Sequence, residues 1–207
     1  MINVVFDNFL LVMQRGGWVM WPLLVLMVTA GTLVMERLFF WIRTNQPRRM
    51  SRFEEIVRLL RHGQRESARV LAVEDHSVYG RAAMRLVDRR ADLAAAADAT
   101  ESQRPRLERF MSTLSTVITA APLLGILGTV TGLIQSFNIL AQDQSVRDLG
   151  AVSGAIGEAL LTTAVGLGVS IVVLFPYNAF RAQIDRTLSR FEVLIAAASR
   201  AHGDDPS

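Results

Sequence analysis

The chain contains no cysteine and no lysine. The missing cysteine excludes disulfides, thiol catalysis and thiolate metal sites. The three histidines are His62, His76 and His202, and all lie in polar segments without a nucleophile or a metal-ligand arrangement around them. We therefore expect neither an enzyme nor a bound metal or cofactor.

Charged residues are also missing from long stretches of the chain. Of its 207 residues, 51% are hydrophobic and 20% charged, so the apolar residues must be segregated. A bilayer core takes roughly 20 apolar residues in a helix. No charge occurs in residues 16–35 or 110–142, and Glu158 is the only ionised residue in 150–180. These three runs predict an all-α membrane protein with three transmembrane helices.

The arginines indicate the orientation in the membrane. All 22 basic residues are arginine, with fifteen in residues 43–109 and four in 181–200. Only Arg15 and Arg147 fall on the opposite side. By the positive-inside rule the N-terminus is outside, and the 43–109 segment and the C-terminus are cytoplasmic. The transmembrane helices should therefore carry long cytoplasmic helical extensions.

The charge pattern gives no sign of nucleic-acid binding. The sequence pI is about 10.4, but the net charge is only +3. Acidic residues are interleaved with the arginines throughout the cytoplasmic segment. We therefore expect no nucleic-acid partner.

These patterns divide the chain into seven segments. They are an outer amphipathic segment (1–15), transmembrane helices (16–42, 110–140 and 151–180), a cytoplasmic helical region (43–109), an outer loop (141–150) and a cytoplasmic C-terminal helix and tail (181–207). Within the cytoplasmic region, Ser51 has the spacing of a helix N-cap. A second helix is expected from about Ser77 through Ala97, and Pro105 is expected to begin the helix of the second span.

Small and hydroxyl residues recur in the second and third spans. In the second span the glycines are Gly125, Gly128 and Gly132, with a GxxxG spacing between the last two. In the third span, every fourth residue is small or polar: Gly154, Glu158, Thr162, Gly166 and Ser170. In lipid this composition indicates either close helix packing or a polar path. The first span is rich in Leu, Val and Met, as expected of a lipid-facing helix.

Three motifs resemble the MotA/TolQ/ExbB proton channel family. They are residues 121–132 followed by Phe137, residues 156–167 followed by Pro176, Tyr177 and Asn178, and the stretch from Gly17 to Arg37. They cover roughly half of the chain, in the family's order. Three spans and short outer loops favour the TolQ/ExbB branch over the four-span MotA branch.

The resemblance implies a stator subunit of a proton-driven motor in the bacterial inner membrane. It implies a homopentamer whose second and third spans line a pore. Two copies of a single-span TolR/ExbD-like subunit would occupy this pore, and an Asp on that partner would carry the proton. A TonB- or TolA-like protein and membrane lipid are further implied partners. Whether the output is transport, envelope maintenance or gliding stays open, and H⁺ is favoured over Na⁺.

Thr129 and Thr163 lie near the middle of their spans and match the family positions that face the partner's Asp. A hydroxyl can donate to a carboxylate and accept from a carboxylic acid. The alternative is that these threonines only hydrogen bond to a backbone carbonyl one turn earlier. Thr162, rather than Thr163, shares the small-residue stripe with Glu158, so either or both threonines could line the path.

The sequence also leaves open the role of Glu158 and the function of the whole chain. Glu158 could gather protons, organise water or pair with a neighbouring subunit. Glu36 and Arg37 are expected to form an ion pair at the membrane interface. The competing function is a non-conducting scaffold whose arginine-rich helices dock another protein.

Overall fold

A computed structural model describes residues 17–88, 93–142 and 149–203. Within these ranges every regular element is a helix. The chain divides into two compact units. The span unit contains Met1–Met35 and Phe110–Tyr177, and the extension unit contains Glu36–Arg109 and Asn178–Ser207. The divisions fall inside helices α2 and α9, so both helices contribute residues to each unit.

Three helices are long and apolar enough to cross a membrane: α2 (Met20–Thr44), α8 (Met111–Gln142) and α9 (Leu149–Gly203). The prediction of an all-α protein with three such helices is confirmed. Helix α9 has 55 residues and is therefore about 80 Å long at about 1.5 Å per residue. A bilayer core is only about 30 Å thick, so a large part of α9 lies outside it.

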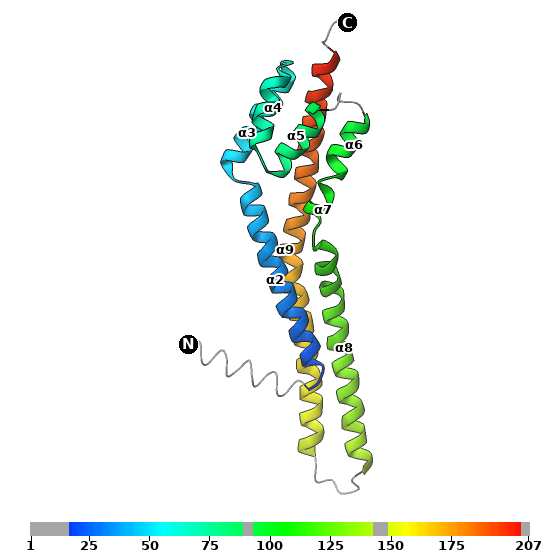
Figure 1. Ribbon diagram of the computed structural model, residues 1–207. Coiled ribbons are helices and arrows are strands. Elements are labelled where there is room, and N and C mark those ends of the chain that lie inside the picture. Colours follow the sequence, from blue (N-terminus) through cyan, green and yellow to red (C-terminus); the bar gives the residue numbers. More distant parts are fainter. Residues whose placement is uncertain (1–16, 89–92, 143–148, 204–207) are drawn as a thin grey trace. The chain divides into compact units, whose positions relative to one another are not determined.

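In the span unit, α8 and the first half of α9 run antiparallel and side by side (Figure 1). Small residues lie between them, and large apolar side chains are exposed on their other faces. The exposed set includes Leu123, Ile126, Phe137, Leu160, Val172 and Phe175. In water this arrangement would be unfavourable, but in lipid the outer faces can be apolar while the helices approach closely.

The extension unit is built from the end of α2, the second half of α9 and five shorter helices. These are α3 (Pro47–Arg61), α4 (Arg65–Glu74), α5 (Val78–Asp88), α6 (Leu93–Glu101) and α7 (Arg104–Leu107). Tyr79 of α5 is fully buried, and its ring centroid lies 5.0 Å from that of Phe53 and 6.0 Å from that of Phe191. The Arg190 guanidinium donates a hydrogen bond of 2.7 Å to the Tyr79 hydroxyl. One aromatic cluster thus joins α3, α5 and α9.

The turn before α5 is fixed by two polar side chains. The Asp75 carboxylate accepts hydrogen bonds from the Ser77 amide (2.9 Å) and the Ser77 hydroxyl (2.7 Å). The Ser77 Oγ in turn accepts from the Tyr79 amide at 3.2 Å, as an N-cap side chain does. A Cβ at Gly80 would overlap the Asp75 backbone, so this close turn requires glycine.

Two predicted helix starts are wrong. Helix α3 begins at Pro47, and Ser51 lies one turn inside it with its hydroxyl donating to the Pro47 carbonyl at 3.1 Å. Proline needs no hydrogen-bond acceptor in a first turn, so it displaces serine as the start signal. Pro105 lies in the short α7, and the chain turns at Phe110, with φ of 65°, before α8 begins at Met111.

The prediction of one helix from Ser77 through Ala97 is also wrong. Helices α5 and α6 pack against each other, and Arg85 forms an ion pair of 2.8 Å with Asp98. Thirteen residues of continuous helix would separate these side chains by about 20 Å. The predicted segment at 1–15, residues 143–148 of the outer loop and residues 204–207 of the tail lie outside the described ranges.

Candidate functional site

Glycines allow α8 and α9 to approach closely in the span unit. A Cβ at Gly132 would lie 2.6 Å from the Ala159 Cβ, and one at Gly125 would lie 2.9 Å from the Thr163 Cα. A Cβ at Gly128 would overlap the Thr162 side chain. These distances are shorter than van der Waals contact, so any larger residue would push the two helices apart.

The same contact occupies the middle of the α9 stripe. A Cβ at Gly166 would overlap the Ala121 carbonyl of α8, and the Ser170 hydroxyl donates to the Ile118 carbonyl at 2.7 Å. Gly154 differs, because it is exposed and no described atom lies within 4 Å of its Cβ position. The faces that carry Gly125, Gly128, Gly132 and Gly166 therefore pack against each other within one chain.

Thr129 and Thr163 meet at one peptide group. The Thr163 hydroxyl crosses from α9 and donates to the Gly125 carbonyl at 2.7 Å. In an α-helix the Gly125 carbonyl is also the acceptor for the amide of Thr129, four residues later. The Thr129 hydroxyl itself donates to the Ile126 carbonyl at 2.7 Å. The two threonines are therefore connected through α8 at the middle of the span pair.

Burial separates Thr162 from Thr163. Thr162 is only 2% exposed, lies against Gly128 and donates to the Ala159 carbonyl at 2.7 Å. Thr129 and Thr163 are half-buried and reach the surface of the helix pair. Of these three threonines, Thr129 and Thr163 offer a hydroxyl oxygen to a group outside the pair, whereas Thr162 contributes to the packing.

Glu158 lies beside the start of the first span. A Cβ at Gly17 would overlap the Glu158 carboxylate, and Gly17 has a φ of 60°. Thr131 and Gln135 join Glu158 in the lining of a cavity of about 40 Å³. This volume accommodates one or two waters, and three polar side chains can hold them. The cavity has room for water beside the Glu158 carboxylate.

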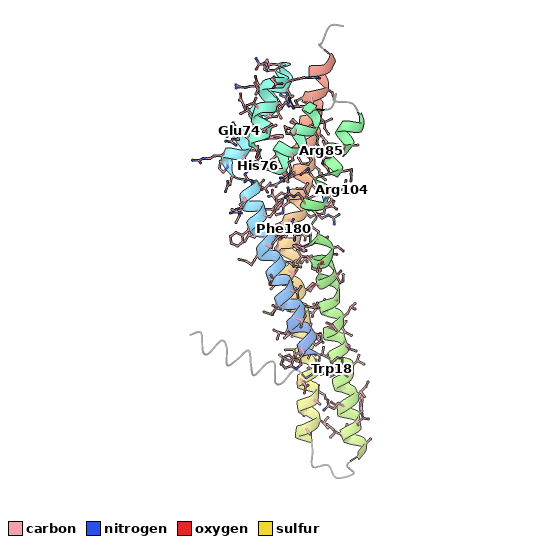
Figure 2. The ribbon with its side chains drawn as sticks, in the orientation of Figure 1. Trp18, Glu74, His76, Arg85, Arg104 and Phe180 are labelled. Carbon is pink, nitrogen blue, oxygen red and sulfur yellow. The ribbon has the colours of Figure 1, made fainter. Side chains whose placement is uncertain are left out.

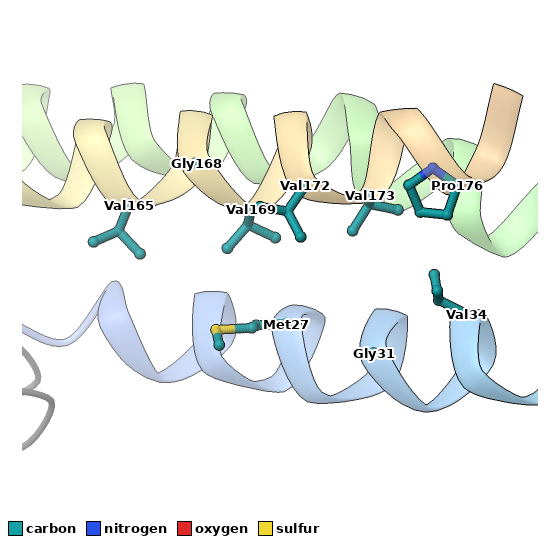
Figure 3. Close-up of a pocket in the computed structure, with 9 residues that line it drawn as sticks. All are labelled: Met27, Gly31, Val34, Val165, Gly168, Val169, Val172, Val173 and Pro176. Atoms are coloured by element: carbon teal, nitrogen blue, oxygen red, sulfur yellow. The ribbon is translucent and has the colours of Figure 1, made fainter. Parts of the chain in front are cut away.

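Helices α2 and α9 line an apolar groove of about 360 Å³ (Figure 3). Its lining residues are Met27, Gly31, Val34, Val165, Gly168, Val169, Val172, Val173 and Pro176. None of these side chains is titratable, so the groove offers no proton-transfer chemistry.

A feature that the sequence alone did not reveal is the burial of Arg37. Its side chain is 1% exposed, and its Nη1 donates to the carbonyls of Arg106 (3.0 Å) and Leu107 (3.2 Å) at the end of α7. Its Nε forms the expected ion pair with Glu36, at 2.9 Å. A cation at unpaired helix carbonyls is favourable, so Arg37 joins α2 to α7. Sequence spacing gave no signal for this contact between residues 70 positions apart.

The spans carry no acid at mid-depth. Helix α8 has no ionisable side chain, and Glu158 is the only carboxylate in α9 before residue 181, where Tyr177 is the other titratable side chain. A proton path through a membrane normally requires a titratable group at depth. The threonines can exchange hydrogen bonds but cannot themselves carry a proton at ordinary pH.

The fold and site define a three-span helical membrane protein whose second and third spans form a glycine-packed, hydroxyl-bearing pair. The model of the MotA/TolQ/ExbB proton channel family matches residues 64–193. The chain belongs to this family, which is a proton-channel family rather than an enzyme family.

Several relatives carry names from the ExbB and TolQ groups. The chain is 31% identical over 175 residues to putative biopolymer transport protein ExbB-like 3 of Synechocystis sp., covering 82% of this chain and 83% of the relative. It is 36% identical over 93 residues to the Tol-Pal system protein TolQ of Pseudomonas aeruginosa, covering 45% and 40%. It is 42% identical over 71 residues to biopolymer transport protein ExbB of Salmonella typhimurium, covering 34% and 29%.

Proposed function

We propose that the chain is the channel and stator subunit of a motor driven by proton-motive force in a bacterial inner membrane. It works with a single-span TolR/ExbD-like subunit and, through it, with a TonB- or TolA-like protein. The output is envelope transport, envelope maintenance or motility. The observation that carries the proposal is the hydrogen bond from the Thr163 hydroxyl to the Gly125 carbonyl, one helical turn before the half-buried Thr129, in a span pair without a central carboxylate.

The hydrogen bonds of these threonines suit a proton carrier supplied by the partner. Each hydroxyl donates its proton to a backbone carbonyl, so its oxygen lone pairs remain able to accept. A neutral carboxylic acid on the partner helix can therefore donate to Thr129 or Thr163 directly. When that acid ionises, a hydroxyl must rotate away from its carbonyl to donate to the carboxylate. The site thus distinguishes the two protonation states of the partner.

The exposed apolar faces support assembly into a homopentamer with two partner helices in its pore. The small-residue faces of α8 and α9 are already occupied within the chain. Large apolar side chains such as Phe137, Leu160 and Phe175 remain exposed for lipid and neighbouring subunits. Native mass spectrometry of the co-purified complex would count the subunits. A stable monomer that binds the partner one to one would contradict this assembly.

Proton flux in vesicles containing both subunits tests the role of the threonines. Thr129→Val with Thr163→Val keeps the side-chain shape and removes both hydroxyls. We expect flux to fall by more than about tenfold, because two hydrogen bonds of about 1 kcal/mol each are lost to the proton carrier. As a single change, Thr163→Ser keeps the hydroxyl at this position, so flux should stay near that of the wild type.

Thr119→Val is the matched control on α8. Its hydroxyl is exposed and donates only to the carbonyls of Ser115 and Thr116 on its own helix, so flux should be unchanged. Assembly is checked by co-purification of the partner with every variant. Normal flux through the assembled double-valine complex would remove the threonines from the path. Absence of flux through the assembled wild-type complex would favour the non-conducting scaffold.

A further inference from the structure

The extension unit carries an open basic cavity of about 470 Å³ near the end of α2. Its polar lining comes from four arginines and one histidine together with three other residues: Arg43, Arg49, Arg81, Arg106, His76, Glu36, Thr44 and Ser77. Phe39, Phe40 and Val78 supply the apolar part of the lining. Figure 2 labels His76, which lies on the turn between α4 and α5. We call this space the basic cavity.

The positive charge of the basic cavity exceeds the negative charge around it. Among the described residues, Arg43, Arg49 and Arg106 form no ion pair with a carboxylate. Glu36, the acid in the lining, is bound by Arg37 at 2.9 Å and lies 3.9 Å from Arg109. Its charge is therefore already balanced by two arginines that do not line the cavity.

The arginines of the basic cavity are close enough to repel one another. Burial lowers the pKa of Arg81, and repulsion from Arg106 and Arg49 lowers it further, while Asp75 opposes these effects. Arginine remains protonated at any physiological pH, so the fold keeps these like charges together rather than losing one. A bound anion would remove the repulsion.

The surroundings of the basic cavity distinguish a lipid headgroup from a soluble anion. The lining residues of α2 belong to the last turns of a helix that can span a membrane. In the same turns Leu38, Phe39 and Ile42 are 43%, 62% and 57% exposed. Exposed apolar side chains beside arginines match the chemistry of a phospholipid, whose acyl chains adjoin its phosphate. A soluble phosphate would need no such apolar wall.

We propose that the basic cavity binds the phosphate headgroup of an anionic phospholipid from the adjacent membrane leaflet. Arg43 and Arg49 contact the phosphate, and Phe39 lies along the acyl chains. The site fixes the end of α2 relative to α3, α5 and α7 within the extension unit. This function is independent of proton conduction, because none of its residues belongs to the Thr129–Thr163 site.

Lipid retention by the purified full-length protein tests the site. The protein is reconstituted with mixed phosphatidylglycerol and phosphatidylcholine, re-extracted in detergent and examined by native mass spectrometry. Each arginine near a membrane surface contributes about 1 kcal/mol, which is about fivefold in affinity. We therefore expect Arg43→Gln and Arg49→Gln each to lower retained phosphatidylglycerol by about fivefold and to leave phosphatidylcholine unchanged.

Arg48→Gln is the matched control, because Arg48 is exposed on the same turn of α3 and does not line the basic cavity. It should leave retention within about twofold of the wild type. Equal losses for Arg48→Gln and Arg49→Gln would reduce the effect to general surface charge and overturn the site. Circular dichroism of each variant checks that the helices remain intact.

Two further measurements distinguish a phospholipid headgroup from a soluble anion. Phe39→Gln should weaken phosphatidylglycerol retention, whereas free inorganic phosphate should not displace the lipid. Displacement by inorganic phosphate together with normal retention by Phe39→Gln would reassign the basic cavity to a soluble anion. Unchanged retention in the Arg43→Gln/Arg49→Gln double variant would overturn the proposal. Retention that is lost only when the protein oligomerises would show that a second copy fills the cavity, which also overturns it.

Discussion

The Ser170 hydroxyl of α9 donates a hydrogen bond of 2.7 Å to the Ile118 carbonyl of α8. Pro122 lies four residues after Ile118 inside α8 and has no amide hydrogen. The Ile118 carbonyl therefore lacks its usual helical donor, and Ser170 supplies one. In a membrane an unsatisfied carbonyl is costly, so a hydroxyl from a neighbouring helix makes the interior proline tolerable.

The first prediction concerns this pair. Ser170→Ala should destabilise the protein by about 1 kcal/mol, because the Ile118 carbonyl loses its donor. In a Pro122→Ala background the new amide of residue 122 can donate to the Ile118 carbonyl. Ser170→Ala should then destabilise the protein much less. A double-mutant cycle by detergent unfolding measures the difference. Ser136→Ala is the control, since its hydroxyl only donates to Gly132 on its own helix. Equal costs in both backgrounds would show that Ser170 does not compensate for Pro122.

The second prediction compares two glycines on α9. Gly166→Ala should destabilise the protein by about 1–3 kcal/mol, because its Cβ would overlap the Ala121 backbone, which cannot move aside like a flexible side chain. Gly154→Ala meets no described atom within 4 Å and replaces a poor helix former, so it should be neutral or slightly stabilising. Thermal unfolding of both variants in detergent would check this. A larger loss at Gly154 would contradict the α8–α9 packing.

The third prediction is topological and follows from the arginine distribution. The chain has no cysteine, so a single introduced cysteine can be labelled without background. Position 74 suits the experiment because Glu74 is exposed, whereas its neighbour Asp75 is 5% exposed. Glu74→Cys should react with an impermeant maleimide only after the cells are opened. Ala141→Cys, which is exposed and lies in the predicted outer loop, should react in intact cells. Reaction of position 74 from outside would reverse the proposed orientation.

The sequence predicted the spans well because the cost of burying charge in lipid leaves long uncharged runs. It also predicted the stripe on α9, since a period of four residues places Glu158, Thr162 and Gly166 on one side of a helix. It could not predict which surface that side contacts. Small residues permit close approach to any helix, in the same chain or in another, and only the structure shows that α8 occupies this face.

In the extension unit, the spacing of charged residues along the sequence does not predict where the helices end. Arg85 and Asp88 lie three residues apart, which suits a solvated face of one long helix. The structure instead pairs Arg85 with Asp98 across two packed helices. The burial of Arg37 was equally unpredictable, because its acceptors are the backbone carbonyls of Arg106 and Leu107, which leave no trace in side-chain patterns.

The last prediction concerns Glu158. Glu158→Gln should lower proton flux by about threefold, equivalent to about 0.6 kcal/mol, because glutamine keeps the contacts with water and loses only the charge. This loss is smaller than that expected for the Thr129→Val/Thr163→Val variant. Glu158 lies near the first residues of α9, the end that we predict to face the outside, where water can replace part of its function. A Gln variant with as little flux as the valine variant would make Glu158 an obligatory proton carrier.

Gly17→Ala tests whether the position of Glu158 matters as well as its charge. The new Cβ would displace the Glu158 carboxylate and would also strain a backbone with φ of 60°. Gly63→Ala separates these effects, because Gly63 has φ of 71° and no described atom within 4 Å of its Cβ position. If the carboxylate must stay at Gly17, flux falls for Gly17→Ala and stays normal for Gly63→Ala in equally assembled complexes. Normal flux for both variants would restrict Glu158 to a structural role.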